Sequence, residues 1–221
     1  MENNAQSSRR RHLLGGIAGV IGVILIITSF TINPGPPPGA TNAQLIAFGR
    51  QYYSAILWGA WLQAVGPVFI VIFAFTIVIV AGAANKLVGW MTFFGATVLM
   101  CVSLIEITFY IAVLVEPHNI IMPVVMALIA AVQHLYFIVA APVLFIPLGV
   151  IIIGSSILPR VFGYLAIAIG AFFEVIGIVT LLVLRLPPTV TMLGIVQGLW
   201  WLSASIALII RSKNLNLTAN R

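Results

Sequence analysis

Long apolar stretches alternate with short polar breaks along the whole of this chain. About 20 apolar residues in helical conformation cross the hydrocarbon core of a bilayer, which is roughly 30 Å thick, so each stretch predicts one membrane-spanning helix. We therefore expect an all-α fold, a bundle of six transmembrane helices joined by short loops. The stretches cover residues 13–32, 52–83, 87–114, 123–153, 161–184 and 189–210.

The breaks between these stretches predict how the helices are connected. Residues 33–42, NPGPPPGATN, are rich in proline and cannot continue a helix. The segment that follows is expected to begin as a helix outside the hydrocarbon, with Arg50, Tyr52 and Tyr53 at headgroup depth. The other connections are short, which favours antiparallel, adjacent neighbours and a compact bundle.

The composition agrees with an integral-membrane protein. Of the 221 residues, 62% are hydrophobic and only 6% are charged, too few charges to cover the surface of a soluble domain of this size. Residues 13–210 are therefore expected to form a single transmembrane domain. The flanking segments, 1–12 and 211–221, are basic and leave no room for a separate soluble domain.

The net charge of +6 is distributed as in a membrane protein and not as in a nucleic-acid-binding protein. Six crossings would place most of the basic residues on one side, which is the bias of cytoplasmic loops. Both termini are thus expected in the cytoplasm. The expected partner is the lipid bilayer, with attraction to anionic headgroups, and no nucleic acid is expected. The residues on that side are Arg9, Arg10, Arg11, Lys86, Arg160 and Arg211.

Strongly polar side chains recur near the middle of five of the six stretches. Counted from the nearest outer loop at the helical rise, each lies about 12–17 Å deep. Ionisable groups at that depth normally face the bundle interior and a partner. Small residues on the same helix faces, such as Gly163 and Gly170 beside Glu174, indicate faces that pack on other helices. A shared polar layer is predicted, formed by Gln63, Glu106, Gln133, His134, Glu174 and Gln197.

This layer favours a non-enzymatic protein with a mid-membrane pocket that binds or translocates a small molecule or a proton. In this hypothesis Glu106 and Glu174 carry charge, His134 exchanges protons near neutral pH, and the glutamines form hydrogen-bonding walls. Arg50, Tyr52 and Tyr53 would form the outer mouth of the pocket.

Two other functions fit the same residues. Polar groups between membrane helices also serve as interhelical hydrogen bonds, as expected of a structural or regulatory subunit that packs against another membrane protein. A membrane enzyme acting on a lipid-like substrate is the third alternative. The oligomeric state and the direction of any transport stay open.

Familiar cofactor motifs are missing from the sequence. It contains no H-E-x-x-H pair, Walker loop or dinucleotide fingerprint, and we expect no cofactor. Glu106, His134 and Glu174 have suitable ligand types for a metal ion, but they come from three helices without diagnostic spacing. A hydrolase pairing of Ser103 with His134 is a further alternative, unsupported by a G-x-S-x-G elbow.

One short motif joins the fourth and fifth stretches. Within PLGVIIIGSSILPRVFGYLAIAIGAF, an L-P-R-x-x-G-x-L pattern is formed by Leu158, Pro159, Arg160, Gly163 and Leu165. The segment resembles an uncharacterised bacterial family of six-helix integral-membrane proteins, of the type called domain of unknown function 4386. The resemblance implies the six-helix fold and a bacterial cytoplasmic membrane, and it implies no activity.

Overall fold

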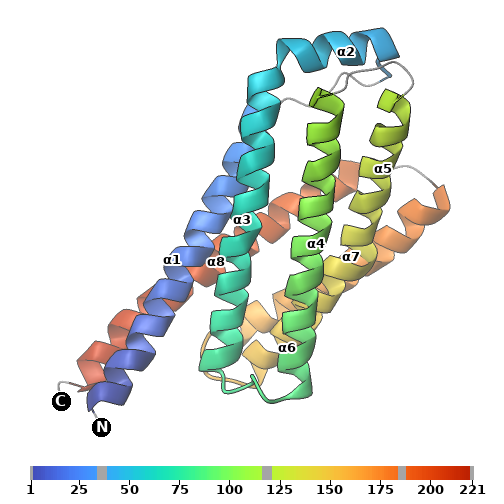
Figure 1. Ribbon diagram of the computed structural model, residues 1–221. Coiled ribbons are helices and arrows are strands. Elements are labelled where there is room, and N and C mark those ends of the chain that lie inside the picture. Colours follow the sequence, from blue (N-terminus) through green and yellow to red (C-terminus); the bar gives the residue numbers. More distant parts are fainter. Residues whose placement is uncertain (1, 34–38, 116–120, 184–187, 220–221) are drawn as a thin grey trace.

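The computed structural model describes residues 2–33, 39–115, 121–183 and 188–219, and these are almost entirely helical (Figure 1). No strand occurs within those ranges, so the expected all-α fold is confirmed. Residues 34–38 of the proline-rich connection lie outside the description. The elements in chain order are α1 (Glu2–Ile32), α2 (Asn42–Gln51), α3 (Tyr53–Val80), α4 (Leu87–Val115), α5 (Ile121–Leu135), the π-helix η1 (Tyr136–Ala140), α6 (Ala141–Ile153), α7 (Arg160–Val183) and α8 (Pro188–Ala219).

Six helical stretches are long and apolar enough to cross a membrane, which confirms the expected number of spans. The chain is therefore a multi-pass membrane protein. Both termini lie at the same end of the molecule, which we call the terminal end, and α2 lies at the opposite end, the α2 end (Figure 1). The spans are Gln6–Ile32, Tyr53–Val80, Leu87–Ala112, Val124–Ile153, Arg160–Thr180 and Met192–Lys213.

The helix ends differ from the sequence-based boundaries most at three places, one of which is the end of α8, which continues to Ala219, past the predicted residue 210. The first helix begins at Glu2, far before residue 13, because residues 2–14 contain no glycine or proline to stop it. The α3 helix ends at Val80, before the predicted residue 83, because Gly82 adopts a left-handed φ of 64°. The amide of Gly82 then bonds Ile79 O, and that of Ala83 bonds Val78 O, a Schellman ending.

The helix expected before the second span is α2, which lies across the α2 end of the bundle (Figure 1). Its start is fixed by a capping box. The Thr41 amide donates to Gln44 Oε1 at 2.8 Å, and the Gln44 amide donates to Thr41 Oγ1 at 3.4 Å. No residue of α2 is buried, in keeping with a helix at the edge of the apolar region.

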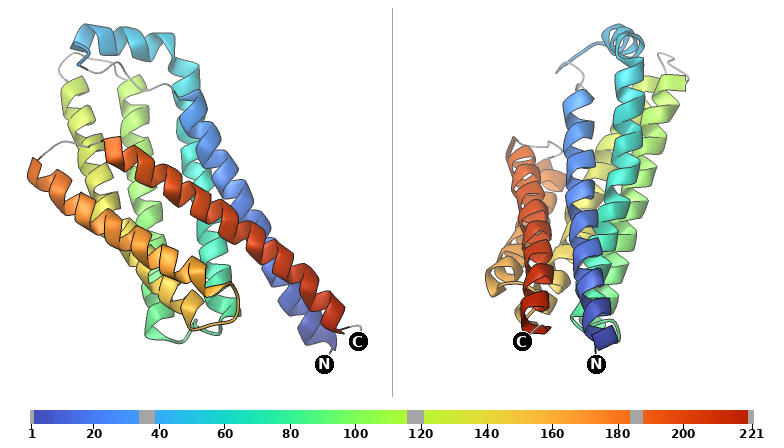
Figure 2. Two further views of the ribbon diagram at one scale, coloured as in Figure 1. Left: turned by 180° about the vertical axis from the view of Figure 1, so that it is seen from behind. Right: turned by 90° about the vertical axis from the view of Figure 1, so that its left-hand side faces the viewer.

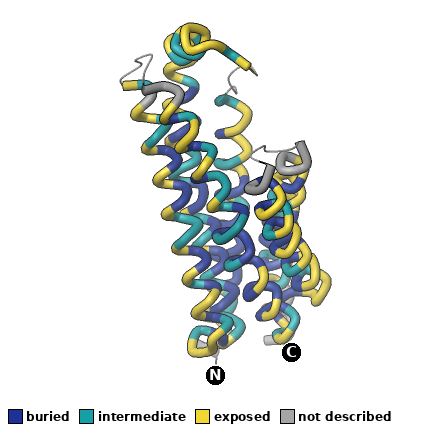
Figure 3. The backbone as a smooth tube through the Cα atoms, turned by 90° about the vertical axis from the view of Figure 1, so that its right-hand side faces the viewer, coloured by how far each residue is buried: buried dark blue, intermediate teal, exposed yellow. Residues whose placement is uncertain are grey.

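The core is centred on α6, which packs against α4 and α7. Figure 3 shows the buried residues along the inner sides of the helices and the exposed ones on the outer sides. Its Phe145, Leu148 and Ile152 are fully buried. From α8, Trp200 and Trp201 pack on the ring of Phe145, with centroids 5.3 and 4.9 Å away. The core is thus built from spans four, five and six together with α4 and with α3, whose Phe73 and Ile77 are also fully buried.

Small residues allow the closest helix contacts, as the sequence predicted. A Cβ added at Gly163 of α7 would lie 2.7 Å from Gly149 O of α6, and one added at Gly149 would lie 2.6 Å from Gly163 O. A Cβ added at Gly95 of α4 would likewise lie very close to Val143 O of α6. That carbonyl has no helical donor, because Pro147 lacks an amide hydrogen. The small-residue faces of α1 and α7 are therefore packing faces.

The bundle is less uniform than the short loops predicted. Figure 2 shows α7 and α8 running obliquely across the other spans. The chain neighbours α7 and α8 touch over a shorter stretch than α1 and α8, the first and last helices. Small residues explain the difference between these two contacts. Gly16 lets α1 approach Ser205 O of α8, whereas a Cβ added at Gly194 or Gly198 of α8 would have no neighbour within 4 Å.

Candidate functional site

The carboxyl group of Glu106 is the centre of a polar cluster shared by three helices. Gln63 of α3 donates from Nε2 to Glu106 Oε2 at 3.1 Å, and Gln133 of α5 donates to Glu106 Oε1 at 2.9 Å. Glu106 itself lies on α4 and is buried, with 9% of its surface exposed. Both carboxyl oxygens are therefore held by amides from different helices. We call Gln63, Ser103, Glu106 and Gln133 the Glu106 cluster.

Ser103 joins the cluster through the main chain of α3. Pro67 has no amide hydrogen, so the carbonyl of Gln63, four residues earlier, has no helical donor. The hydroxyl of Ser103, one turn before Glu106 on α4, donates to that oxygen at 3.0 Å. A released carbonyl at membrane depth needs such a partner. The backbone and the side chain of Gln63 are thus both held by α4.

The cluster satisfies the hydrogen bonds of Glu106 and leaves its charge uncompensated. Its two hydrogen-bond partners are neutral amides, and in the described part of the chain no basic side chain pairs with it. A carboxylate in an apolar surrounding is costly without a counter-charge. The group is therefore suited to hold a proton or a cation from outside the protein.

A second polar contact lies between η1 and α8. The hydroxyl of Tyr136 donates to Gln197 Oε1 at 2.5 Å. Tyr136 begins the π-helical turn, where the amide of Ala141 bonds Tyr136 O five residues back. Pro142 follows, and its ring and missing amide hydrogen disfavour a regular α-helical turn there. Tyr136 was not among the site residues predicted from the sequence. A tyrosine between Gln133 and Pro142 in an apolar stretch could have indicated a polar contact there.

His134 and Glu174 are not joined to either contact. His134 uses Nδ1 for the carbonyl of Ala130 at 2.8 Å, and its buried Nε2 has no partner in the described residues. Glu174 is half-buried on α7, between Gly170 and Gly177, and no described group bonds its carboxyl. The six residues of the predicted layer thus fall into the Glu106 cluster, the Tyr136–Gln197 pair and two separate side chains.

Two alternatives, the metal site and the hydrolase pairing, required His134 to lie beside other functional groups, and neither arrangement is formed in the described residues. Within the described ranges, no group of three or more His, Cys, Asp or Glu side chains could hold a metal ion, so the site of Glu106, His134 and Glu174 is not formed. The glutamines occupy both oxygens of Glu106. The hydroxyl of Ser103 is likewise directed to Gln63 O, and no bond to His134 accompanies it.

The residues of the expected outer mouth lie where α2 meets α3. Tyr52 and Tyr53 are 36% and 46% exposed, and Arg50 is exposed in the last turn of α2. Gln63 follows Tyr53 at about 15 Å along α3 at the helical rise. No described contact connects the two groups, and the mouth stays a prediction.

Comparison with known proteins adds no further guide to function. No family model, curated protein or solved structure matches the chain. The family resemblance carried by residues 158–165 therefore stays a prediction, as does the bacterial cytoplasmic membrane. The geometry around Glu106 is therefore the main indication of function.

Proposed function

We propose that this multi-pass membrane protein binds a proton or a small cation at Glu106 and carries it across the membrane. The observation behind the proposal is the buried carboxyl, with one oxygen bonded by Gln63 and the other by Gln133, and without a basic partner in the described chain. Amide donors orient the group, but they do not neutralise it. A bound proton or cation would supply the missing positive charge.

The two glutamines favour a positively charged ligand over an anion. Each directs its NH₂ group at Glu106, so the amide oxygens Oε1 remain as acceptors with no hydrogen bond among the described residues. Neither oxygen is completely buried, because His134 Nε2 is the sole fully buried and unpartnered side-chain polar atom in that part of the chain. Carboxylate and amide oxygens together are the ligands that hard cations prefer.

His134 is the proposed proton exchanger beside this site. It follows Gln133 directly on α5, and its buried Nε2 has no hydrogen-bond partner among the described residues. Arg50, Tyr52 and Tyr53 are proposed to line the entrance at the α2 end. Glu174 lies outside the Glu106 cluster and has no part in this proposal.

Transport into liposomes tests the proposal directly. The full chain is reconstituted with a pH-sensitive or a sodium-sensitive dye inside, and the matching proton or sodium gradient drives the flux. Glu106→Gln keeps the size and much of the hydrogen bonding but removes the charge, and we expect its flux to fall to that of protein-free liposomes. Glu174→Gln is the matched control, since it makes the same change at a carboxyl outside the cluster, and it should retain the wild-type rate.

Two results would contradict the proposal. Equal flux in the wild type and in Glu106→Gln would show that the carboxyl carries nothing. Wild-type flux no greater than that of empty liposomes would favour the alternative of a structural or regulatory subunit, in which the amides and Glu106 only join helices. Separate proton and sodium gradients identify which cation is carried.

A further inference from the structure

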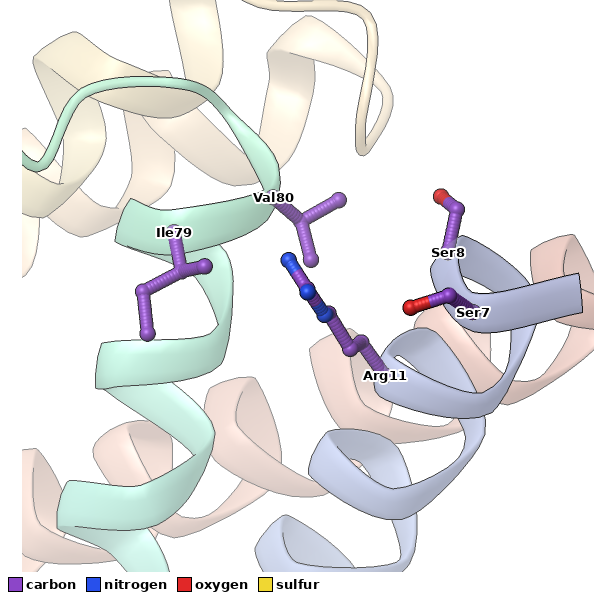
Figure 4. A pocket seen from close by; sticks show the side chains of 5 residues that line it. All are labelled: Ser7, Ser8, Arg11, Ile79 and Val80. Carbon is purple, nitrogen blue, oxygen red and sulfur yellow. The ribbon is translucent and has the colours of Figure 1, made fainter. Parts of the chain in front are cut away.

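A hollow of about 260 Å³ lies at the terminal end, remote from the Glu106 cluster (Figure 4). Its polar wall comes from α1 and its apolar wall from the last turn of α3. Figure 4 shows the guanidinium of Arg11 extended across the hollow toward Val80, with the hydroxyls of Ser7 and Ser8 on the same helix. The five lining residues are Ser7, Ser8, Arg11, Ile79 and Val80.

The polar groups of this hollow have no hydrogen-bond partner among the residues that the structure describes. Arg11 carries five N–H donors, and in the described residues none of them bonds an acceptor or a carboxylate. The hydroxyls of Ser7 and Ser8 are also unbonded there. Three helix-terminal carbonyls of α3 that could have attracted Arg11, those of Ile77, Val78 and Ile79, already accept backbone amides. The donors therefore remain available to a ligand.

The terminal end as a whole has an excess of positive charge. The antiparallel contact of α1 with α8 brings the basic segments of the two chain ends together (Figure 1). Of the four acidic residues in the sequence, Glu106 and Glu174 lie inside spans, and Glu2, at the start of α1, is the acidic residue that the described helices place at this end. Seven basic residues against one acidic residue leave an excess of positive charge that favours an anion from outside the protein. The basic residues at this end are Arg9, Arg10, Arg11, Lys86, Arg160, Arg211 and Lys213.

We propose that the hollow binds the phosphate of an anionic phospholipid. A guanidinium fork with neighbouring hydroxyls matches the oxygens of a phosphate, which takes paired hydrogen bonds from arginine. Ile79, 47% exposed, and Val80 offer apolar contact to the lipid's glycerol and first acyl carbons. The hollow also borders the ends of the spans Gln6–Ile32 and Tyr53–Val80, which is the depth of lipid headgroups. This combination favours a lipid over a soluble phosphate.

Native mass spectrometry of the full chain tests the site. The protein, purified in detergent, is titrated with phosphatidylglycerol, with phosphatidylcholine as the neutral lipid and with inorganic phosphate as the soluble anion. We expect the wild type to retain one phosphatidylglycerol with at least about five-fold preference over phosphatidylcholine, the ratio that about 1 kcal/mol per basic residue provides. Arg11→Gln should lose most of that preference, and Arg11→Lys should keep part of it.

Arg160→Gln is the matched control, because it removes the same charge from an exposed position at the same end, outside the hollow. It should retain the wild-type preference. Equal losses in Arg11→Gln and Arg160→Gln would overturn the site in favour of diffuse surface charge. Competition by inorganic phosphate at concentrations similar to those of the lipid would overturn the lipid assignment. Circular dichroism of each variant confirms that the helices are intact, and the result does not depend on transport by Glu106.

Discussion

The hydroxyl of Ser103 donates a 3.0 Å hydrogen bond to the main-chain oxygen of Gln63, the oxygen that Pro67 leaves without a helical donor. One serine therefore compensates for a proline on the neighbouring helix. The same residue, Gln63, uses its side chain to bond Glu106 one turn further along α4. The proline thus contributes to the Glu106 cluster, because it leaves free the carbonyl through which α4 binds α3.

This relationship predicts a non-additive pair of substitutions. Ser103→Ala should lower the free energy of unfolding by about 1 kcal/mol, since it leaves Gln63 O without a donor. Pro67→Ala restores an amide hydrogen to α3, which can bond that oxygen within the helix. In the Pro67→Ala background, Ser103→Ala should therefore cost little. A double-mutant cycle of reversible unfolding in micelles measures the difference, and equal costs in both backgrounds would refute the compensation.

The amide of Gln133 and the carboxyl of Glu106 should also be energetically coupled. Gln133→Leu removes the 2.9 Å bond to Oε1 and leaves that oxygen unpaired in an apolar surrounding. We expect a loss of about 1 kcal/mol in the wild type and a smaller loss in the Glu106→Leu background, where no carboxyl needs the amide. Unfolding of the four proteins in micelles measures the coupling. Gln197→Leu, which acts outside the cluster, should be insensitive to the state of residue 106.

The six spans and their packing faces could be predicted from sequence because both depend on local patterns. Apolar length sets whether a helix crosses the membrane, and glycine spacing selects the face that approaches a neighbour. Gly163 and Gly149 illustrate the second rule, since a Cβ added at either would collide with the backbone and an isoleucine side chain of the other helix. The α3 helix ends three residues before the predicted residue 83, because the apolar pattern continues past the turn that Gly82 forms.

The grouping of the polar residues could be predicted only in part. The depth of a side chain can be predicted by counting residues from the nearest loop. This count placed Gln63, Glu106 and Gln133 at one depth, and the three side chains are hydrogen-bonded to one another through Glu106. Lateral distance depends on crossing angles, which the sequence does not specify. The α7 and α8 helices run obliquely across the other spans (Figure 2), and in the described residues no hydrogen bond joins Glu174 or Gln197 to the cluster. The π-helical turn at Tyr136 changes the rotation of the chain within a stretch that was treated as one regular helix.

The contact of Tyr136 with Gln197 should stabilise the attachment of α8. Tyr136→Phe removes only the hydroxyl that donates to Gln197 Oε1, while the ring keeps its contacts with Phe137 and Phe173. We expect a loss of about 1 kcal/mol in the free energy of unfolding. Hydrogen exchange followed by mass spectrometry should show faster exchange in α8 near Gln197. Unchanged exchange in that segment would mean that the bond contributes nothing to holding α8.

The close approach of α6 and α7 gives the most direct test of the packing. A Cβ at Gly163 would lie 2.7 Å from the backbone oxygen of Gly149, so Gly163→Ala must push the two helices apart. We expect a loss of about 1–3 kcal/mol, the usual cost of overpacking a core. Gly198→Ala is the control, because nothing lies within 4 Å of its Cβ, and it should be neutral or stabilising by up to about 1 kcal/mol. Thermal unfolding of both variants in the same micelles compares them. Similar stability of the two variants would show that α6 and α7 are not in the close contact that their glycines permit, and a larger loss at Gly198 would point to a neighbour on the open face of α8.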